Sequence, residues 1–520
     1  MPIAATPGAV TPLAICVMAF ALWIVGTNSG ANPSYTAVAP YHAAFLAGGF
    51  LVGRRAGAEN AGSAFRVALV FALALAGWAL WQQMAQGEAR AHGPFVTPAT
   101  LASTINLVLV PGLVLAALGT RRPVLVAALV VLSAALAAAQ SRGGWLALAA
   151  VGVVALLFVR RTKVRAGGKA AAIVIAILAL GWIGYWLARL AWDWGAPQHS
   201  MLDEAAQSSA ARLQLYELAV QGIASSPWLL GSGYHAFYYI LESARPTVPA
   251  YLASTTYFVH NDYLQTLLEL GVPGLAGLLL IIVLPISEAW RAAPRLAETA
   301  DERVALIAIV GAICSMAVHA LADFPFYIPV CVLVYGTALG ILDASLLRTA
   351  CVRPVQLPKF ANPTARGVAV AAIGTLALWT LTLPVAAEAA SAYAQRQWRA
   401  AKGESAAVWF EAARRLDPRD WRYHWYAGQF WLAQAQGSGN AAAANLADAS
   451  FAAGYSANPR EVRNLFGRII VHQRLRKLLP APADPATLRA WADRAVALAP
   501  LDPAVRAERA RVLKDFGGAK

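Results

Sequence analysis

The feature that most limits what this chain can fold into is the recurrence of long apolar segments along its first three quarters. Eleven segments of about 17–25 mostly apolar residues, the length needed to cross the hydrocarbon layer of a membrane, alternate with polar loops. Only 13% of the 520 residues are charged, about half the share in a typical soluble protein. The sequence therefore predicts an all-α, polytopic membrane protein. The expected membrane spans are residues 10–27, 37–53, 66–86, 99–119, 123–140, 144–159, 169–190, 264–288, 304–322, 327–347 and 367–387.

The basic residues of the loops predict how these spans are oriented. Seventeen lysines and arginines fall in the loops on one side of the predicted spans, and only five fall on the other side. Loops rich in lysine and arginine stay in the cytoplasm. We therefore expect the N-terminus to lie inside and the segment after the eleventh span to lie outside. The five arginines of the outer loops are Arg90, Arg142, Arg189, Arg212 and Arg245.

This topology divides the chain into two predicted domains. Residues 1–388 form a membrane domain, which includes one large outer loop at residues 191–262. The many aromatic residues of that loop favour helices that lie on the membrane surface. Residues 389–520 form a second, outer domain with 20 basic and 11 acidic residues. Its positive charge suits anionic lipid head groups or an acidic glycan, or it is an ordinary solvated surface. Nucleic acid is not expected on this side of the membrane.

The outer domain has an internal period. Pro418, Pro459 and Pro500 are each 41 residues apart, and each follows an alanine-rich stretch with helical spacing. Helix pairs closed by a proline resemble tetratricopeptide repeats, although the period of those repeats is about 34 residues. Stacked repeats offer a concave surface, so one interpretation is a platform that binds an envelope protein. A purely structural helical cap is an equal alternative.

Three polar residues on the predicted outer side indicate the chemistry: Arg142, Arg212 and His260. A guanidinium group stays charged and donates two parallel hydrogen bonds to phosphate oxygens. A histidine accepts a proton near neutrality and could deprotonate an attacking hydroxyl. Because charge near hydrocarbon is costly, the pattern favours a site for a lipid-linked phosphate. The alternatives are a capping or snorkelling role for Arg142, a plain lipid contact for Arg212 and a structural role for His260.

Five further residues are weaker candidates for binding substrate. Glu269 falls inside the eighth predicted span, where a carboxylate is either functional or a hydrogen-bonded structural residue. His319 and Asp323 flank an outer turn and could line the same cavity, although Asp323 before Phe-Pro also fits a plain turn. Arg90 and Arg245 could widen the phosphate site.

Several motifs follow one another in the predicted outer loops. They are GPFVTP at residues 93–98, QSRGGW at 140–145, Arg212 followed by GSG at 231–233, FVHNDYLQ at 258–265, LLELGVPG at 267–274 and DFP at 323–325. In this order and on this side they resemble the O-antigen ligase and O-antigen polymerase (Wzy_C-type) superfamily. The resemblance covers roughly residues 66–347 and leaves out the first two spans and the tail.

The resemblance implies a glycosyl transfer outside the cytoplasm that needs no metal ion and no other cofactor. The implied donor is a saccharide on undecaprenyl pyrophosphate, and the acceptor is a hydroxyl on another glycan, a lipid A core or a protein. Arg142 and Arg212 would hold the leaving pyrophosphate, and His260 would assist the acceptor hydroxyl. The chain has neither an Asp-x-Asp motif nor a C-x-x-C motif, so the sequence offers no familiar metal site.

The sequence therefore predicts an inner-membrane glycosyltransferase of the ligase or polymerase type, acting in surface polysaccharide biosynthesis. A protein O-oligosaccharyltransferase of the pilin-glycosylating type is the alternative within the superfamily. Two readings from other classes are a transporter of the lipid-linked glycan and a non-catalytic membrane scaffold. A transporter is expected to have charged residues along a path through the membrane and internal repeats. The predicted spans show neither feature. A scaffold leaves the outer arginines unexplained.

Overall fold

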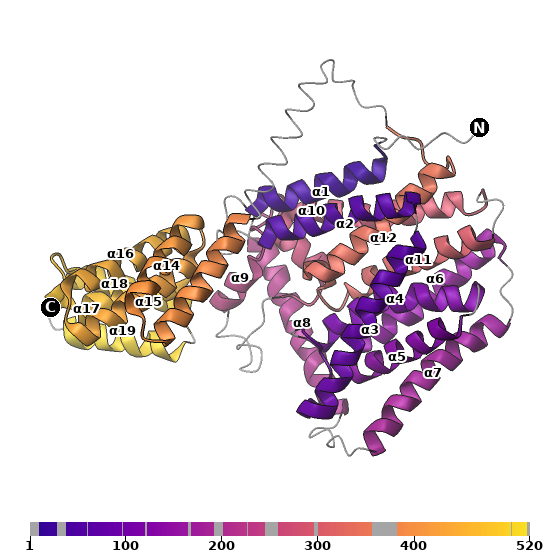
Figure 1. Ribbon diagram of the computed structural model, residues 1–520. Coiled ribbons are helices and arrows are strands. Elements are labelled where there is room, and N and C mark those ends of the chain that lie inside the picture. The colour runs from indigo at the N-terminus through magenta and orange to yellow at the C-terminus, as the bar shows by residue number, and fades with distance from the viewer. Residues whose placement is uncertain are drawn as a thin grey trace.

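The fold is helical. The computed structural model describes residues 10–28, 38–59, 61–95, 97–119, 122–164, 168–191, 201–225, 227–244, 258–295, 300–355, 382–500 and 502–516. Over these residues the regular elements are α-helices and short 3-10 helices (Figure 1), and the one β-bridge joins Val10 to Val355. The predicted all-α class is confirmed.

Ten helices coincide with ten of the eleven predicted spans. Seven of them are long and apolar enough to cross a membrane, by length and composition: α3, α4, α6, α7, α10, α11 and α12. The described part of the chain is thus that of a multi-pass membrane protein, while most of the eleventh predicted span lies outside the described residues. The ten helices are α1 (Pro12–Asn28), α2 (Val38–Glu59), α3 (Ala61–Gln86), α4 (Pro98–Leu118), α5 (Pro123–Ala139), α6 (Arg142–Thr162), α7 (Gly168–Ala191), α10 (Asp262–Ala292), α11 (Ala300–His319) and α12 (Pro329–Arg348).

The closest pair of helices in the bundle is α2 with α12, which are far apart along the chain. A Cβ atom added to Gly53 would overlap the carbonyl of Thr337, and one added to Gly340 would overlap the carbonyl of Phe50. Only glycine therefore lets the two backbones approach so closely. Because lipid is as apolar as a leucine side chain, small residues and close packing hold such pairs together.

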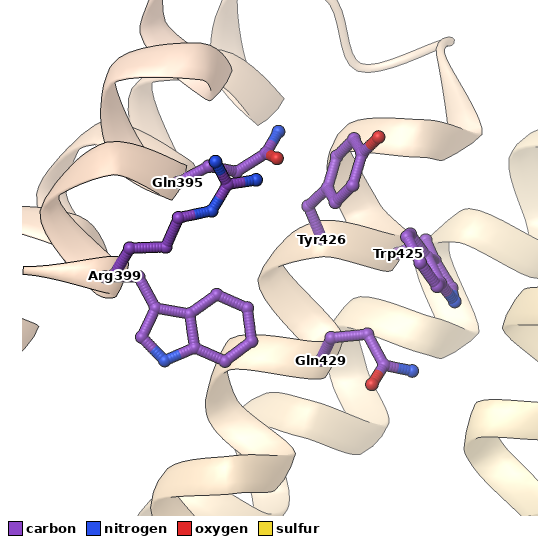
Figure 2. Close-up of a pocket in the computed structure, with 6 residues that line it drawn as sticks. Gln395, Arg399, Trp425, Tyr426 and Gln429 are labelled. Carbon is purple, nitrogen blue, oxygen red and sulfur yellow. The ribbon is translucent and has the colours of Figure 1, made fainter.

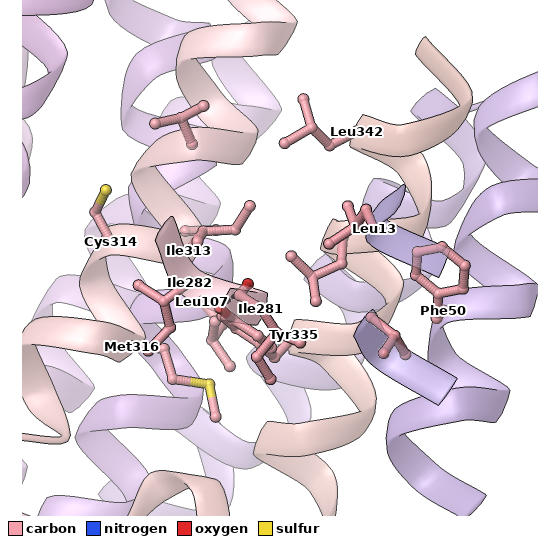
Figure 3. Packing of buried hydrophobic residues seen from close by; sticks show 14 of the residues in the cluster. Leu13, Phe50, Leu107, Ile281, Ile282, Ile313, Cys314, Met316, Tyr335 and Leu342 are labelled. Atoms are coloured by element: carbon pink, nitrogen blue, oxygen red, sulfur yellow. Dashed lines mark hydrogen bonds between the residues drawn. The ribbon is translucent and has the colours of Figure 1, made fainter. Parts of the chain in front are cut away.

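The centre of the bundle is a packed apolar core. Tyr335 of α12 is fully buried, and its hydroxyl donates a hydrogen bond of 3.0 Å to the carbonyl of Ile281 in α10. Figure 3 shows Leu107, Ile281 and Ile282 gathered around this ring, and all belong to one buried cluster. The bond satisfies the one polar atom of a buried tyrosine and fixes α12 against α10.

Two further helices cover one end of the bundle. Because successive helices run in opposite directions, the turns at residues 140–141, 258–261 and 320–328 share one end, which we call the site end. Helices α8 (Met201–Ser225) and α9 (Phe237–Ala244) pack there against the start of α10. The described part of the large loop, which the sequence predicts to be helical, thus contains two helices. The C-terminal ends of α2, α4, α6, α10 and α12, which adjoin the predicted cytoplasmic charges in the sequence, lie at the opposite end.

The C-terminal helices form a stack in which each helix packs against the next. Pro418, Pro459 and Pro500 lie two residues beyond the ends of α14, α16 and α18, so the 41-residue spacing is a repeat of helix pairs. Asp420 and Glu461, also 41 residues apart, cap the helices that follow. The helices span residues 382–399 and then α14 (Gly403–Leu416), α15 (Trp421–Ser438), α16 (Ala441–Ala457), α17 (Val462–Arg474), α18 (Pro485–Leu498) and α19 (Pro503–Phe516).

This stack touches the large loop at the site end. Asn458, which ends α16, donates a hydrogen bond of 2.6 Å from Nδ2 to the hydroxyl of Tyr239 in α9. Helix α18 also packs against α9, and Figure 1 shows the orange and yellow helices beside α9. The C-terminal helices therefore lie at the same end of the bundle as the predicted site.

Candidate functional site

His260 lies just before the start of α10. The side-chain oxygen of Asn261 accepts hydrogen bonds from the amides of Tyr263 and Leu264, both at 3.0 Å, so Asn261 caps this helix. His260, just before the cap, has a φ of +60°, a left-handed conformation that costs energy for a residue with a Cβ. The hydroxyl of Tyr216 in α8 donates a hydrogen bond of 2.9 Å to the carbonyl of His260. The cap and α8 thus hold His260 in place.

A buried carboxylate lies beneath the His260 ring. Nδ1 of His260 is 3.1 Å from Oδ1 of Asp323, and Nε2 of His319 is 3.6 Å from Oδ2 of Asp323. The second distance is longer than a hydrogen bond. Burial alone would raise the pKa of Asp323, but the two imidazoles beside it hold that pKa below its usual range. Because an ionised carboxylate only accepts hydrogen bonds, the hydrogen of this contact lies on Nδ1 of His260.

Aromatic rings support this pair from one side. Phe324 stacks on Phe258 with 4.0 Å between ring centroids and meets the His260 ring edge-on at 4.9 Å. The amide of Asp262 donates a hydrogen bond of 2.9 Å to the carbonyl of Ala320, which joins the start of α10 to the turn after α11. His260 and Asp323 are therefore held by packing as well as by hydrogen bonds.

The first residue of α6 brings Arg142 to the same place. Ser141 caps this helix by accepting a hydrogen bond of 3.2 Å from the amide of Gly144, and Asn106 of α4 donates one of 2.9 Å to the Gly144 carbonyl. Nη1 of Arg142 lies 3.4 Å from Oγ of Ser209 in α8. A Cβ atom on Gly143 would lie 3.5 Å from Nε2 of His319, so the Arg142 turn adjoins the His319 ring.

Helix α8 connects these two parts of the site. Ser209, which contacts Arg142, lies three residues before Arg212, and Tyr216, which bonds to His260, lies four residues after it. Residues three and four apart share a helix face, so Arg212 lies between the two contacts. Arg212 makes no ion pair with a carboxylate in the part of the chain described here. The structure thus brings Arg142, Arg212 and His260 together with His319 and Asp323.

Of the two weaker arginine candidates, the structure describes Arg90 but not Arg245. The guanidinium of Arg90 donates hydrogen bonds to the carbonyls of Ala139 at 3.4 Å and Gln140 at 3.1 Å. A cation at the carboxyl end of α5 is favourable because that end carries partial negative charge. Arg90 therefore supports the turn that presents Arg142. Arg245 lies outside the described residues.

Glu269 is engaged in holding the large loop. Its oxygens accept hydrogen bonds from the amides of His235 (2.8 Å) and Phe237 (3.2 Å), from Nε2 of Gln265 (3.1 Å) and from the hydroxyl of Tyr327 (2.9 Å). Oε1 of Gln265 accepts a hydrogen bond from a backbone amide, which fixes the orientation of its side-chain amide. With four partners around it, Glu269 fits the structural alternative left open by its sequence.

Helix α10 is broken at Gly271, directly after Glu269. Gly271 has a φ of +68° and lies against the backbone of residues 229–231, where a Cβ atom would overlap. The carbonyl of Glu269 accepts a hydrogen bond of 2.9 Å from the amide of Gly233. Pro273 has no amide hydrogen to offer this carbonyl, so the GSG loop takes its place. The span predicted as one continuous helix is therefore kinked where the large loop docks.

An apolar groove runs along the bundle from the Arg142 turn. It has a volume of about 620 Å³ and lies between α4, α6 and α7. On α6 it is lined from Trp145, one turn after Arg142, to Val159, a distance of about 21 Å at the rise of an α-helix. The lining residues of α7 run from Gly168 to Leu178.

Comparison with known protein families adds a finding about these residues. Residues 127–279 match the model of the Wzy_C family, which is described as O-antigen ligase. This segment is therefore similar to the O-antigen ligase family. The family implies a membrane protein with a glycosyl-transfer function. No curated protein matches the chain.

The O-antigen ligase segment contains Arg142, Arg212, His260 and Glu269, whereas His319 and Asp323 follow it in the chain. The carboxylate that contacts His260 thus comes from outside the matched residues. A site assigned from this segment alone would lack Asp323.

Two residues of the matched segment that contact the candidate site residues, Tyr216 and His235, were not predicted from the sequence. Tyr216 is one of the many aromatic residues of the large loop, and its position four residues after Arg212 is a usable signal, because it places both on one face of α8. His235 was not singled out. Burial, followed by the nearby His42, lowers the pKa of His235 to about 3, so His235 stays neutral and is a poor proton acceptor.

Proposed function

We propose that this protein is an inner-membrane glycosyltransferase of the O-antigen ligase or polymerase type. It transfers a saccharide from undecaprenyl pyrophosphate to an acceptor hydroxyl on the periplasmic face. The observation that carries this proposal is the meeting of Arg142, Arg212 and His260 at the site end, opposite the basic loops. Residues 1–388 are the transferase domain, and residues 389–520 are a periplasmic, tetratricopeptide-like domain.

The donor pyrophosphate is held by Arg142 and Arg212. Breaking the bond between the anomeric carbon and the pyrophosphate leaves negative charge on the phosphate oxygens. Two guanidinium groups stabilise that charge as it develops. Arg142 is the first residue of α6, so the partial positive charge of this helix end acts on the same anion. No metal ion is needed for this role in the proposed mechanism.

The polyprenyl tail of the donor lies in the groove between α4, α6 and α7. The groove is apolar and begins one turn from Arg142. Consecutive helices α6 and α7 pack mainly against other partners, α11 and α5, which leaves the space between them to a lipid chain. A tail in this groove places its pyrophosphate beside Arg142.

The acceptor hydroxyl is activated by His260. Nε2 of His260 takes the hydroxyl proton while the oxygen bonds to the anomeric carbon, and the old carbon–oxygen bond breaks with its electron pair passing to the pyrophosphate. Asp323 keeps the proton on Nδ1 and stabilises the imidazolium that forms. Attack from the face opposite the pyrophosphate gives inversion.

A protein O-oligosaccharyltransferase is the second candidate. The contact between Asn458 and Tyr239 brings residues 389–520 beside the site end, where an envelope protein bound to this domain would be near the acceptor side. A glycan or a lipid A core remains the acceptor in the first proposal.

The test begins with the purified protein in lipid nanodiscs and the cell's own lipid-linked saccharide. Transfer should occur in EDTA and should be lost in Arg212→Ala and His260→Ala proteins that still insert and fold. A scaffold would keep its cellular role in both variants, which would overturn the proposal. Deleting the gene then identifies the acceptor: single capped units mean a polymerase, bare lipid A core a ligase, and unmodified envelope protein a protein glycosyltransferase.

A further inference from the structure

The C-terminal helices enclose a pocket that the transferase site does not use. It has a volume of about 360 Å³, within the range of about 300–1,000 Å³ that small-molecule sites occupy. It lies between residues 382–399 and α15, and Figure 2 shows Gln395 and Arg399 facing Tyr426 and Gln429 across it. The lining residues are Gln395, Trp398, Arg399, Trp425, Tyr426 and Gln429.

The rings of this pocket are held by contacts beneath and beside them. Trp398 meets the buried rings of Phe410 and Phe430 edge-on, with centroid distances of 6.3 Å and 5.7 Å. Trp425 packs against Tyr426 at 5.0 Å, and the guanidinium of Arg463, which does not line the pocket, lies 5.9 Å from the Trp425 ring. A binding surface that is already ordered loses little freedom when a ligand binds.

We infer that this pocket binds a short stretch of a saccharide chain. The flat faces of sugar rings present C–H groups that pack on indole and phenol rings, and each sugar also presents hydroxyls around its edge. Gln395 and Gln429 supply both donors and acceptors for such hydroxyls. Two indoles, one phenol and two neutral amides therefore match a sugar better than a lipid or a nucleic acid.

Arg399 adds a preference for a saccharide that carries an acidic group. Its side chain is exposed and makes no ion pair with any described residue. The domain as a whole has 20 basic and 11 acidic residues, so an anionic chain is attracted to it. A peptide bound to the concave face of a repeat domain would contact several repeats. This pocket is confined to two helices, which suits a smaller ligand.

This inference depends on the proposed function only for the choice of ligand, a saccharide made or extended by the same protein. Helix α9 connects the two regions, because Tyr239 bonds to Asn458 of the C-terminal domain. The pocket would keep hold of a chain near the site end while one end of that chain reacts.

The experiment is a calorimetric titration of the full-length protein in nanodiscs. The probe is the oligosaccharide released by mild acid from the cell's own lipid-linked pool. All proteins also carry Arg142→Ala and Arg212→Ala, so that the membrane site contributes nothing and a failure of transfer cannot be mistaken for a failure of the pocket. Tyr426→Ala and Arg399→Ala should each weaken binding about tenfold or more.

Two matched controls come from the same domain. Trp409 is an exposed ring of α14 outside the pocket, and Arg396 lies one turn before Arg399; Trp409→Ala and Arg396→Ala should bind the probe as the parent does. Because Arg399 is exposed, its variant stays folded even if Tyr426→Ala does not. Equal affinity in the parent and Arg399→Ala proteins overturns the inference, and so does binding of an acidic peptide, but not the oligosaccharide, to the pocket.

Discussion

The imidazole of His260 and the carboxylate of Asp323 are joined by a contact of 3.1 Å between Nδ1 and Oδ1, although 63 residues separate them. Asp323 is almost fully buried, whereas 23% of the His260 side chain is exposed. In the proposed mechanism, the buried carboxylate orients the ring and the exposed imidazole meets the substrate. This division of roles leads to the first prediction.

Replacing His260 by alanine, or Asp323 by asparagine, should lower the rate of transfer by about 10²- to 10⁴-fold, the range found for general acid–base groups. Asparagine can present either an oxygen or an NH₂ group to Nδ1, so the ring loses its fixed protonation pattern. A matched control is the pair His472 and Asp448 in the C-terminal domain, 2.9 Å apart, where Asp448→Asn should leave transfer unchanged. Full activity in Asp323→Asn would contradict the proposed role.

The pH dependence of this pair has a definite sign. Because the pKa of Asp323 lies below its usual range, the carboxylate stays ionised at every pH where a histidine titrates. A fall of kcat/KM at acidic pH should therefore come from a group other than Asp323. A pH–rate profile of the parent protein checks this, because a fall caused by Asp323 would begin only below the range where histidines titrate. The contact stabilises the fold above the unfolded-state pKa of about 3.9 and is lost as pH falls through the folded value.

Replacing Arg142 or Arg212 by lysine should lower the rate of transfer. Lysine keeps the positive charge but lacks the planar fork that binds two phosphate oxygens, so Arg142→Lys and Arg212→Lys should each lower kcat about 10²- to 10³-fold, as loss of one transition-state donor does elsewhere. Arg160, which is exposed at the opposite end of the bundle, provides the control. Transfer by Arg160→Lys should equal that of the parent, and parental kcat in both site variants would refute phosphate binding by these two residues.

Glu269 should be needed for the fold of the large loop. In Glu269→Gln an NH₂ group replaces one of the oxygens that accept hydrogen bonds from backbone amides. Two buried N–H groups then face each other without an acceptor, which should lower the free energy of unfolding by about 1–3 kcal/mol. The expected result is a lower unfolding temperature and faster proteolysis near residues 227–236. Glu217→Gln, an exposed change on α8, should alter neither. If Glu269→Gln lost transfer with unchanged stability and proteolysis, Glu269 would instead act on substrate.

The spans and the leading site residues were predictable from sequence because each depends on local information. An apolar stretch must be helical in lipid whatever surrounds it, and the orientation rule then placed Arg142, Arg212 and His260 on one side. In the structure, α8 contacts both Arg142 and His260 and carries Arg212 between these two contacts. What each residue does in catalysis stays a prediction.

The remaining features depend on contacts between distant segments, which a single sequence does not display. Glu269 looked equally suited to substrate and to structure, and only the amides of residues 235 and 237 distinguish the two. At the kink at Gly271, a loop some 40 residues upstream bonds to the Glu269 carbonyl that Pro273 leaves free. Arg90 was grouped with the phosphate site, whereas its contacts are carbonyls at the end of α5.

The contact between α2 and α12 yields the last prediction, which concerns stability alone. Gly48 and Gly53 lie on the same helix, yet a Cβ atom would meet nothing within 4 Å at Gly48 and would overlap the Thr337 backbone at Gly53. Gly53→Ala should therefore cost about 1–3 kcal/mol, as overpacking does, because the overlapping atoms are backbone and cannot rotate away. Gly48→Ala adds the same methyl group without a clash.

The measurement is the unfolding temperature of both proteins in the same detergent, together with the fraction that elutes as a single species. Gly53→Ala should unfold at a lower temperature, and Gly48→Ala at the parental one. Since α2 also carries His42, whose Nε2 lies 2.6 Å from the carbonyl of Tyr327 at the site end, separating α2 from α12 should disturb the turn that holds Asp323. Equal unfolding temperatures of the two variants would mean that α2 and α12 leave room for a methyl group at Gly53, which would contradict the prediction. Neither change should then affect transfer.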